Sequence, residues 1–196
     1  MKKLILGVFT LSMLLFTSCG GTIKLDQPDT VETLKTKVLE NLKEGAFVTA
    51  IDIFPIHNTI TTEISSVVIY YKTAEGEERS THVYIDQMLD PLDKEGSSVR
   101  SRKEIGRAIN DYDFSIIYSN VGKAAQQVID AGAKYSGVGT YSITFNSDPT
   151  KDKHSFSILS SAGSSVQGRN LVTEYYEHEA EADAEGNVTV EVVTEE

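Results

Sequence analysis

The chain has 196 residues, a formal net charge of −11 at pH 7 and a single cysteine. This length corresponds to one domain or two small ones, and a single cysteine excludes a disulfide within the chain. The excess of acidic residues disfavours nucleic acid as a partner, because the protein would repel a phosphate backbone.

The first 21 residues follow the order of a secretory signal. Lys2 and Lys3 precede a mostly apolar stretch, residues 4–16, and small residues follow it. This stretch is shorter than the roughly 20 apolar residues that a membrane-spanning helix needs. A positive, an apolar and a small-residue segment in this order are typical of an export signal that is removed from the mature protein.

Cys19 closes this segment in a pattern that resembles the signal of bacterial lipoproteins. Leu15 stands four positions before Cys19, and Ser18 stands immediately before it. The resemblance implies cleavage before Cys19, a diacylglyceryl group on its thiol, and an acyl chain such as palmitate on the new amino terminus. Two or more lipid chains anchor a protein stably. The alternative is an ordinary cleaved signal with a cysteine nearby by chance.

The resemblance divides the N-terminus into a signal peptide, residues 1–18, and a lipidated tether, residues 19–28. It implies a lipid-anchored protein of the bacterial cell envelope. Gly20 follows the cysteine where an aspartate would signal retention in the inner membrane of enteric bacteria. We therefore expect the outer membrane, in a host that sorts lipoproteins by this rule.

The first ordered element is predicted to be a helix from Asp29 to the glycine at position 45. Asp29 and Glu32 have the spacing of a capping box. An apolar stripe at helical spacing gives this helix a face to bury, and it consists of Val31, Leu34, Val38 and Leu42.

Strand patterns follow directly over residues 46–54, 63–73 and 79–85. In the first of them, Phe47, Ile51 and Ile53 occupy alternate positions. Residues 74–77 have the composition of a tight turn, so the second and third strands should form a hairpin.

The middle of the chain is predicted to be less regular. Residues 86–100 have loop composition, and Ser101 with Glu104 suggests a short helix up to residue 110. Residues 112–119 fit a strand or an extended link. A second helix is predicted from Asn120, which is a good N-cap, with a small-sided face made of Val121, Ala124, Ala125, Val128 and Ala131.

Four further strands are predicted over residues 138–145, 154–160, 170–176 and 188–193. Turn residues separate them at 146–149, 161–168 and 184–187. Several strands carry tyrosines, and the adjacent pairs Tyr70–Tyr71 and Tyr175–Tyr176 should point to opposite faces. Exposed tyrosines on a sheet suit contact with protein or glycan, although filling the half-buried surface of a sheet explains them equally well.

These elements predict an α+β fold in which helices pack on antiparallel sheet. The order of a helix and then strands occurs twice, which suggests two tandem modules over residues 29–110 and 111–196; one continuous domain is the alternative. This element order resembles the tandem helix-plus-sheet modules of PepSY-like and β-lactamase-inhibitor-like envelope proteins. That resemblance covers residues 29–193 and implies no functional residues.

Catalytic and metal-binding motifs find little support. The four histidines, His57, His82, His154 and His178, show no HExxH pattern and fit surface or hydrogen-bonded structural roles. The GxSxG and SxxK motifs of serine hydrolases are absent. Glu181, Asp183 and Glu185 imitate the start of a calcium loop, but Val192 stands where an EF-hand needs a bidentate glutamate. A solvated acidic hairpin is the other interpretation.

The sequence therefore predicts a non-catalytic, lipid-anchored envelope protein that binds a protein or peptide and needs no cofactor. The alternative is a small-ligand carrier or a cryptic enzyme with a pocket between helix and sheet. Such a pocket would have to bring together several histidines and carboxylates.

Overall fold

The computed structural model describes residues 22–42, 44–56, 60–85, 97–98, 106–167 and 170–193. The expected signal peptide with Cys19, residue His57 and the capping box at residues 101–104 lie outside these ranges. Within them the chain combines helices with antiparallel strands. The predicted α+β class is therefore confirmed.

The described residues form two α-helices, two short 3-10 helices and eight strands. The helices are η1 (Pro28–Thr30), α1 (Val31–Glu40), α2 (Ser115–Asp130) and η2 (Pro149–Lys151). The strands are β1 (Phe47–Pro55), β2 (Ile64–Lys72), β3 (Glu78–Tyr84), β4 (Ser97–Ser98), β5 (Tyr135–Thr144), β6 (Lys153–Gln167), β7 (Asn170–Asp183) and β8 (Val188–Glu191).

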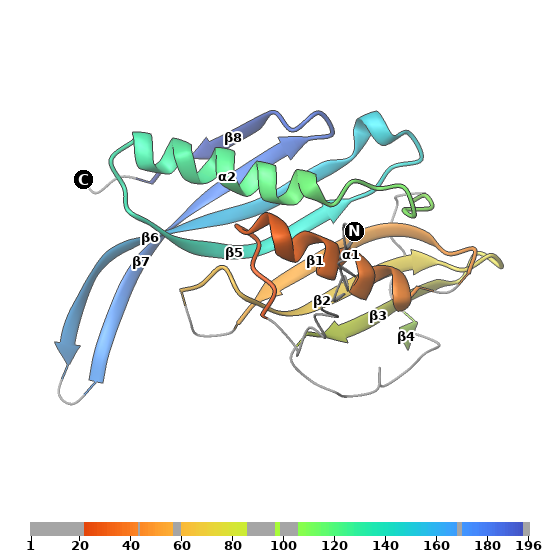
Figure 1. Ribbon diagram of the computed structural model, residues 1–196, viewed down its shortest axis with the longest axis horizontal. Coiled ribbons are helices and arrows are strands. Elements are labelled where there is room, and N and C mark those ends of the chain that lie inside the picture. Colours follow the sequence, from red (N-terminus) through yellow and green to blue (C-terminus); the bar gives the residue numbers. More distant parts are fainter. Residues whose placement is uncertain are drawn as a thin grey trace, which may run out of the picture.

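All eight strands belong to one antiparallel sheet with the order β4-β3-β2-β1-β5-β6-β7-β8. The two halves of the chain meet where β1 pairs with β5, from Ala50 opposite Thr144 to Ile53 opposite Tyr141. The predicted hairpin of β2 and β3 is confirmed. Figure 1 shows α1 and α2 on the same side of this sheet.

Helix α1 buries three of the four residues of the predicted stripe, Val31, Leu34 and Val38. The helix ends at Glu40 rather than near Gly45, so Leu42 lies beyond it and is only half-buried. The predicted capping box at Asp29 is wrong. Pro28 opens a 3-10 turn instead, and α1 begins only after Thr30. The Thr30 hydroxyl lies 2.9 Å from the Gln27 carbonyl oxygen, so it stabilises this turn rather than capping the helix.

Helix α2 begins five residues before the predicted start at Asn120. The Asp113 carboxylate accepts a hydrogen bond from the Ser115 amide over 2.9 Å and fixes the first turn. Residues 115–119 are therefore helical rather than extended, and the additional turn buries Ile117. The predicted face is otherwise confirmed by the burial of Val121, Ala124, Ala125 and Val128, while Ala131 is exposed at the C-cap.

The predicted helix over residues 101–110 is wrong where the structure describes it. Gly106 has a φ of +74°, which is outside the helical region. Arg107 then forms an antiparallel bridge with Val48, through two backbone hydrogen bonds of 2.9 and 3.0 Å. A side chain at position 106 would meet the Val48 carbonyl oxygen at 2.5 Å, so this bridge requires glycine.

Two strands are longer than predicted. Residues 161–167 continue β6 although their serine- and glycine-rich sequence predicted a loop, and residues 177–183 continue β7. The two strands pair from Lys153 opposite Asp183 to Gln167 opposite Asn170. Beyond Ser160 neither β5 nor β8 accompanies them, so a two-stranded ribbon extends from the body (Figure 1).

The predicted tether is wrong for its described residues, 22–28. Ile23 and Leu25 are buried in the core. The Leu25 amide donates to the Thr62 carbonyl oxygen, and the Ile64 amide donates to the Ile23 carbonyl oxygen, each over 3.0 Å. Apolar residues at positions 23 and 25 therefore fasten this segment beside β2.

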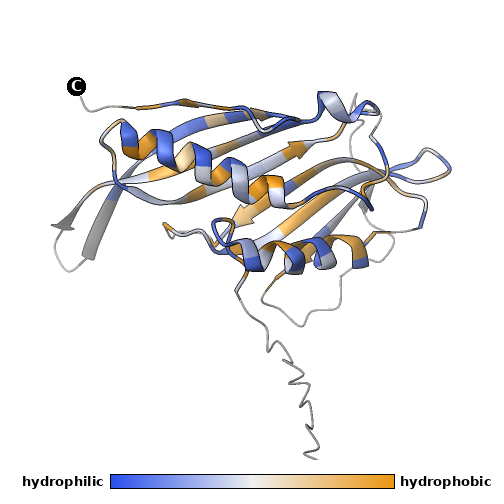
Figure 2. Ribbon diagram, turned by 45° about the horizontal axis from the view of Figure 1, so that its top comes forward, coloured by the Kyte–Doolittle hydropathy of each residue, from blue (hydrophilic) through white to orange (hydrophobic). Residues whose placement is uncertain are grey.

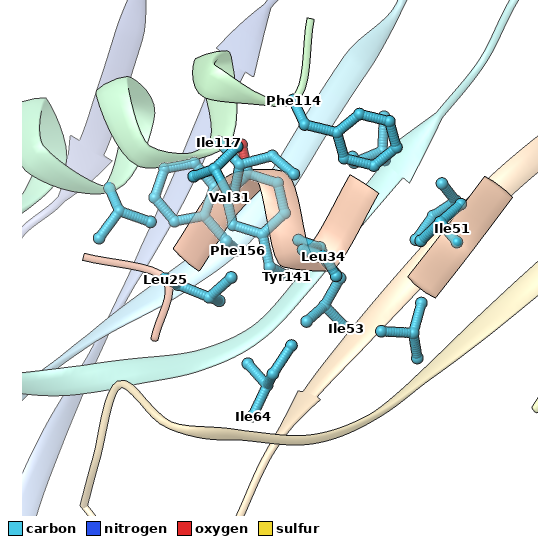
Figure 3. Close-up of a cluster of buried hydrophobic side chains, with 14 of the residues drawn as sticks. Leu25, Val31, Leu34, Ile51, Ile53, Ile64, Phe114, Ile117, Tyr141 and Phe156 are labelled. Carbon is cyan, nitrogen blue, oxygen red and sulfur yellow. The ribbon is translucent and has the colours of Figure 1, made fainter. Parts of the chain in front are cut away.

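The core fills the space between the helices and the sheet. Figure 3 shows side chains from α1, α2 and the central strands meeting there, with Tyr141 and Phe156 at its centre. The rings of these two residues stack with their centroids 4.7 Å apart. Figure 2 shows apolar and polar residues mixed along the strands and mostly polar connecting turns, and one buried sheet face requires such mixing.

Candidate functional site

The face of the sheet opposite the helices forms a broad surface. Alternation along the strands directs Val67, Ile69 and Tyr71 into the core, so the residues between them point to the other side. In the described part of the chain, no helix lies over that side (Figure 1). We call this surface the open face.

Aromatic side chains gather on the open face over β1–β3. Phe47 is 48% exposed and Tyr84 is 37% exposed. The Tyr84 ring stacks on His82 with 4.2 Å between centroids, and Val68 and Tyr70 of β2 are half-buried beside them. Phe47 pairs with Lys72 and so lies at the other end of the strands from Tyr84, which pairs with Ser66. We call the other four residues, Val68, Tyr70, His82 and Tyr84, the aromatic patch. The expectation that one tyrosine of the pair Tyr70–Tyr71 lies outside the core is confirmed.

The position of Phe47 corrects one sequence prediction. Phe47 was expected to share a face with Ile51 and Ile53, but the register of β1 shifts between Val48 and Ala50. This β-bulge places Val48, Ile51 and Ile53 in the core and leaves Phe47 outside. An exposed aromatic residue therefore joins the open face.

Acidic side chains occupy the other end of the open face. Register pairs Ser155 with Glu181 and Ser157 with Glu179, and it continues to Glu191 on β8. The acidic strip consists of the exposed residues Glu177, Glu179, Glu181, Asp183 and Glu191. The open face thus joins an apolar region to a negatively charged one.

The three residues that imitate a calcium loop lie at the end of β7 and in the turn that follows it. Glu181 and Asp183 lie on β7, and Glu185 lies in the turn before β8. The Asp183 carboxylate accepts hydrogen bonds from the amides of Glu185 and Asn187, over 3.0 and 2.9 Å, and so holds the turn. Among the residues with described positions, no three His, Cys, Asp or Glu side chains gather as metal ligands would.

A separate cavity of about 760 Å³ opens beside the first turns of α2. Its walls come from the segment before α2, from η2 and from the β7–β8 turn. Its polar lining comprises Arg107, Asp111, Tyr112, Asp113, Ser115, Ser119, Lys123, Asp152, His154 and Glu185. One histidine and four carboxylates therefore share one cavity.

Arg107 and Asp152 form a mostly buried ion pair at this cavity. One Arg107 guanidinium nitrogen lies 2.5 Å from an Asp152 carboxylate oxygen, and Asp152 is only 4% exposed. The second Asp152 oxygen accepts from the Asn146 amide over 2.8 Å. The guanidinium also lies over the rings of Tyr112 and Phe145, at 5.6 and 5.3 Å from their centroids. These contacts fix Arg107 in one position.

His154 lies behind the ion pair in a buried chain of polar groups. The Asn120 amide group donates to the Tyr141 hydroxyl over 3.1 Å. The Tyr141 hydroxyl lies 2.9 Å from His154 Nδ1, and His154 Nε2 lies 3.5 Å from the Tyr112 hydroxyl. The Tyr141 oxygen accepts from Asn120, so its own proton is free to go to Nδ1, and Nε2–H then points to Tyr112; we assign this tautomer.

Burial sets the protonation of these groups. It lowers the pKa of His154 to about 4, although the charges of Asp152 and Asp183 act in the opposite direction. It also raises the pKa of both Tyr112 and Tyr141 above the ordinary tyrosine value. At neutral pH the hydrogen-bonded side chains of Asn120, Tyr141, His154 and Tyr112 are therefore all uncharged. The series ends at the Tyr112 hydroxyl, and Tyr112 lines the cavity.

His178 and Ser160 also touch, but the hydrogen bonding opposes catalysis by this pair. The Val193 amide donates to His178 Nδ1 over 3.0 Å, so the ring proton must sit on Nε2. That proton points to the Ser160 hydroxyl oxygen, 2.8 Å away. A general base would need an unprotonated nitrogen there. The predicted structural role fits His154 and His178, and His82 lies on the surface.

No sequence pattern indicated the position or the lining of the cavity. The predicted elements put Arg107 in a short helix and Tyr112 in a strand or an extended link, and none of them includes Asp152. His154 lies between Lys153 and Ser155, which are both exposed. This alternation is the one sequence signal that could have indicated that the His154 side chain points into the protein.

Comparison of the chain with protein-family models, curated proteins and solved structures finds no match. In the described part of the chain, neither helix is long and apolar enough to cross a membrane.

Proposed function

We propose that this is a lipid-anchored protein of the bacterial cell envelope, held in the outer membrane by Cys19, whose open face binds a protein or peptide partner without catalysis. The observation that carries the proposal is the aromatic patch, because exposed aromatic side chains on a rigid sheet are typical anchors of protein interfaces. His154 and His178 already use their Nδ1 atoms in hydrogen bonds within the fold, which supports a role in binding rather than in catalysis.

The charges of the open face specify the partner further. The acidic strip lies on the same side of the sheet as the aromatic patch, so one partner can contact both. Complementary charge speeds association and excludes wrong partners. We therefore expect a protein surface that combines an apolar area with lysine or arginine residues.

The anchor is tested by Cys19→Ala, which should move the protein from the membrane fraction to the soluble fraction. It should also abolish incorporation of radiolabelled palmitate, because both the diacylglyceryl group on the thiol and the acyl chain on the new amino terminus require Cys19. Ser18→Ala is the matched control, since it keeps a small residue before the cysteine and should leave labelling intact. Continued labelling of the Cys19→Ala variant would contradict the anchor.

The open face is tested by placing a photo-reactive phenylalanine analogue at position 84 in intact cells. Illumination should produce one discrete adduct with a protein, because Tyr84 is exposed within the aromatic patch. The same analogue at Ile129, which is 47% exposed on α2, is the matched control and should give none.

The charge of the partner is tested in the same cells. Changing Glu179 and Glu181 to lysine should weaken the adduct from position 84, because it reverses the charge of the acidic strip, which a partner that spans the open face also contacts. Equal adducts from positions 84 and 129 would contradict binding by the open face, and so would the absence of any adduct.

We also propose that the two halves of the chain, residues 29–110 and 111–196, are tandem copies of one module. Each half begins with a helix and continues with antiparallel strands, and the strand order is symmetric about the β1–β5 pair. The symmetry supports a duplication in which the first strands of the two copies became neighbours.

A further inference from the structure

The ribbon that β6 and β7 form outside the body lacks the support that the rest of the sheet has (Figure 1). It consists of residues 161–167 of β6 and 170–175 of β7, which pair with each other. β5 accompanies β6 only as far as Ser160, and β8 accompanies β7 only from Glu179 onward. In the described part of the chain, no third strand therefore pairs with the ribbon. An isolated pair of strands is at best marginally stable in water, so the ribbon has a reason to gain a further strand.

The two edges of the ribbon are not equivalent. On the β6 side the register shifts between Ser161 and Gly163, and Gly163 has a φ of +136°. The Ser161 amide is also engaged, since it donates to the Lys134 carbonyl oxygen over 3.1 Å. A β-bulge disrupts the pairing of an edge with another chain. On the β7 side, residues 170–175 follow one another in the ladder without an extra residue. β7 therefore presents the more regular edge.

The sequence of the ribbon does little to block this edge. Proteins commonly protect an exposed edge with charged side chains, lysine above all, or with proline. Residues 161–175 contain no lysine and no proline, and their only charged residues are Arg169 and Glu174. Tyr175 of β7 is 53% exposed, which is the highest value among the large apolar side chains of the described residues. The ribbon is thus a neutral and accessible strand pair in an acidic protein.

The charge distribution favours a second copy of this chain as the added partner. Two copies that each carry a net charge of −11 repel each other. The repulsion is weakest where they meet through a segment without net charge, and the ribbon is such a segment. It also projects away from the body (Figure 1), so antiparallel pairing of two ribbons would leave the two acidic bodies at opposite ends. An edge that pairs with its own copy in this way forms a closed, two-fold symmetric contact.

We propose that two copies of the protein pair through the outer edges of their β7 strands, antiparallel and centred on Thr173. The two ribbons then form one four-stranded sheet, in which backbone groups at the two edges bond to each other. This register sets Tyr175 opposite Leu171 of the second copy, and cross-strand pairs of an aromatic and an aliphatic residue stabilise a sheet. The contact does not involve the open face, so it leaves that surface available.

The contact is tested by disulfide cross-linking of the full chain, purified in detergent, with Thr173→Cys. Opposite Cα atoms in an antiparallel pair lie about 4.5–5.5 Å apart, which a disulfide can bridge. Mild oxidation should therefore give a covalent dimer on a non-reducing gel. Thr189→Cys is the matched control, because Thr189 is exposed on the edge strand β8. The unaltered chain shows the background from Cys19. Equal yields from positions 173 and 189, or no dimer from position 173, would overturn the proposal.

A charge exchange tests the two-fold symmetry. Two differently tagged copies should co-purify when both are unaltered, and several-fold less when both carry Thr173→Lys or both carry Thr173→Glu, because like charges then oppose each other. A Thr173→Lys copy should again co-purify with a Thr173→Glu copy, which would also show that both variants fold. Failure of this mixed pair to recover, with native circular dichroism, would overturn pairing through this edge. Recovery of a different protein in place of the second copy would overturn self-association in favour of a foreign strand.

Discussion

Arg107→Met should lower the free energy of unfolding by about 3–5 kcal/mol, because it leaves the Asp152 carboxylate buried without its counter-charge. Asp152 is 4% exposed and keeps only its hydrogen bond from Asn146 in this variant. Methionine fills much of the space of the arginine side chain, so lost packing contributes less than the unpaired charge. Urea denaturation at pH 7 measures the change.

A neighbouring ion pair supplies the control. Lys151 and Asp148 lie 3.5 Å apart, and their side chains are 68% and 45% exposed. Lys151→Met should therefore change the free energy of unfolding by less than about 1 kcal/mol. Adding Asp152→Asn to Arg107→Met should recover part of the loss, since it removes the unpaired charge. Equal small effects of both single variants would show that the Arg107–Asp152 pair does not stabilise the fold.

Mild acid should destabilise the protein through His154. The folded pKa of this histidine is about 4, against 6.5 for an unperturbed histidine. Above pH 6.5 neither the folded nor the unfolded state holds a proton there. As the pH falls from 6.5 to 4, the unfolded chain binds a proton that the native side chain excludes, so stability is lost over that window. The expected loss is about 2 kcal/mol by pH 5 and about 3 kcal/mol by pH 4.

This pH dependence is measured by urea denaturation at pH 7.5, 6 and 5. His154→Gln should reduce the slope, whatever its own cost at neutral pH, while His178, whose pKa burial also lowers, accounts for a further part of it. His82→Gln should change the slope far less because His82 is exposed. The lowered pKa values of Asp113 and Asp183 cause a further loss only at more acidic pH. An unchanged slope in His154→Gln would contradict the assignment.

Hydrophobic periodicity was sufficient to predict most elements of the fold. The stripe of α1 and the hairpin of β2 and β3 follow from spacing that the structure retains. The start of α2 was missed because Ile116, Ile117 and Tyr118 have strand propensity. The helix is favoured there only by tertiary packing, which buries Ile117 in the core. The outer part of β6 was missed because its serines and glycine resemble a loop, whereas pairing with β7 supplies the hydrogen bonds.

The cavity could not be predicted in the same way. Arg107 and Asp152 are 45 residues apart in sequence, and neither belongs to a motif. Their contact depends on the bridge to Val48 and on the turn before β6, which are both tertiary features. The open face was easier to anticipate, because alternation along a strand already assigns neighbouring residues to opposite sides.

The burial of Ile23 determines how the proposed lipid anchor would orient the molecule. Only three residues separate Cys19 from Ile23, and such a segment spans at most roughly 14 Å. The Ile64 amide, at the start of β2, donates a hydrogen bond to the Ile23 carbonyl oxygen. That corner of the sheet would therefore remain within roughly 14 Å of the lipid headgroups. The protein would then stand on the bilayer with restricted rotation, and a partner would have to approach the open face from a limited set of directions.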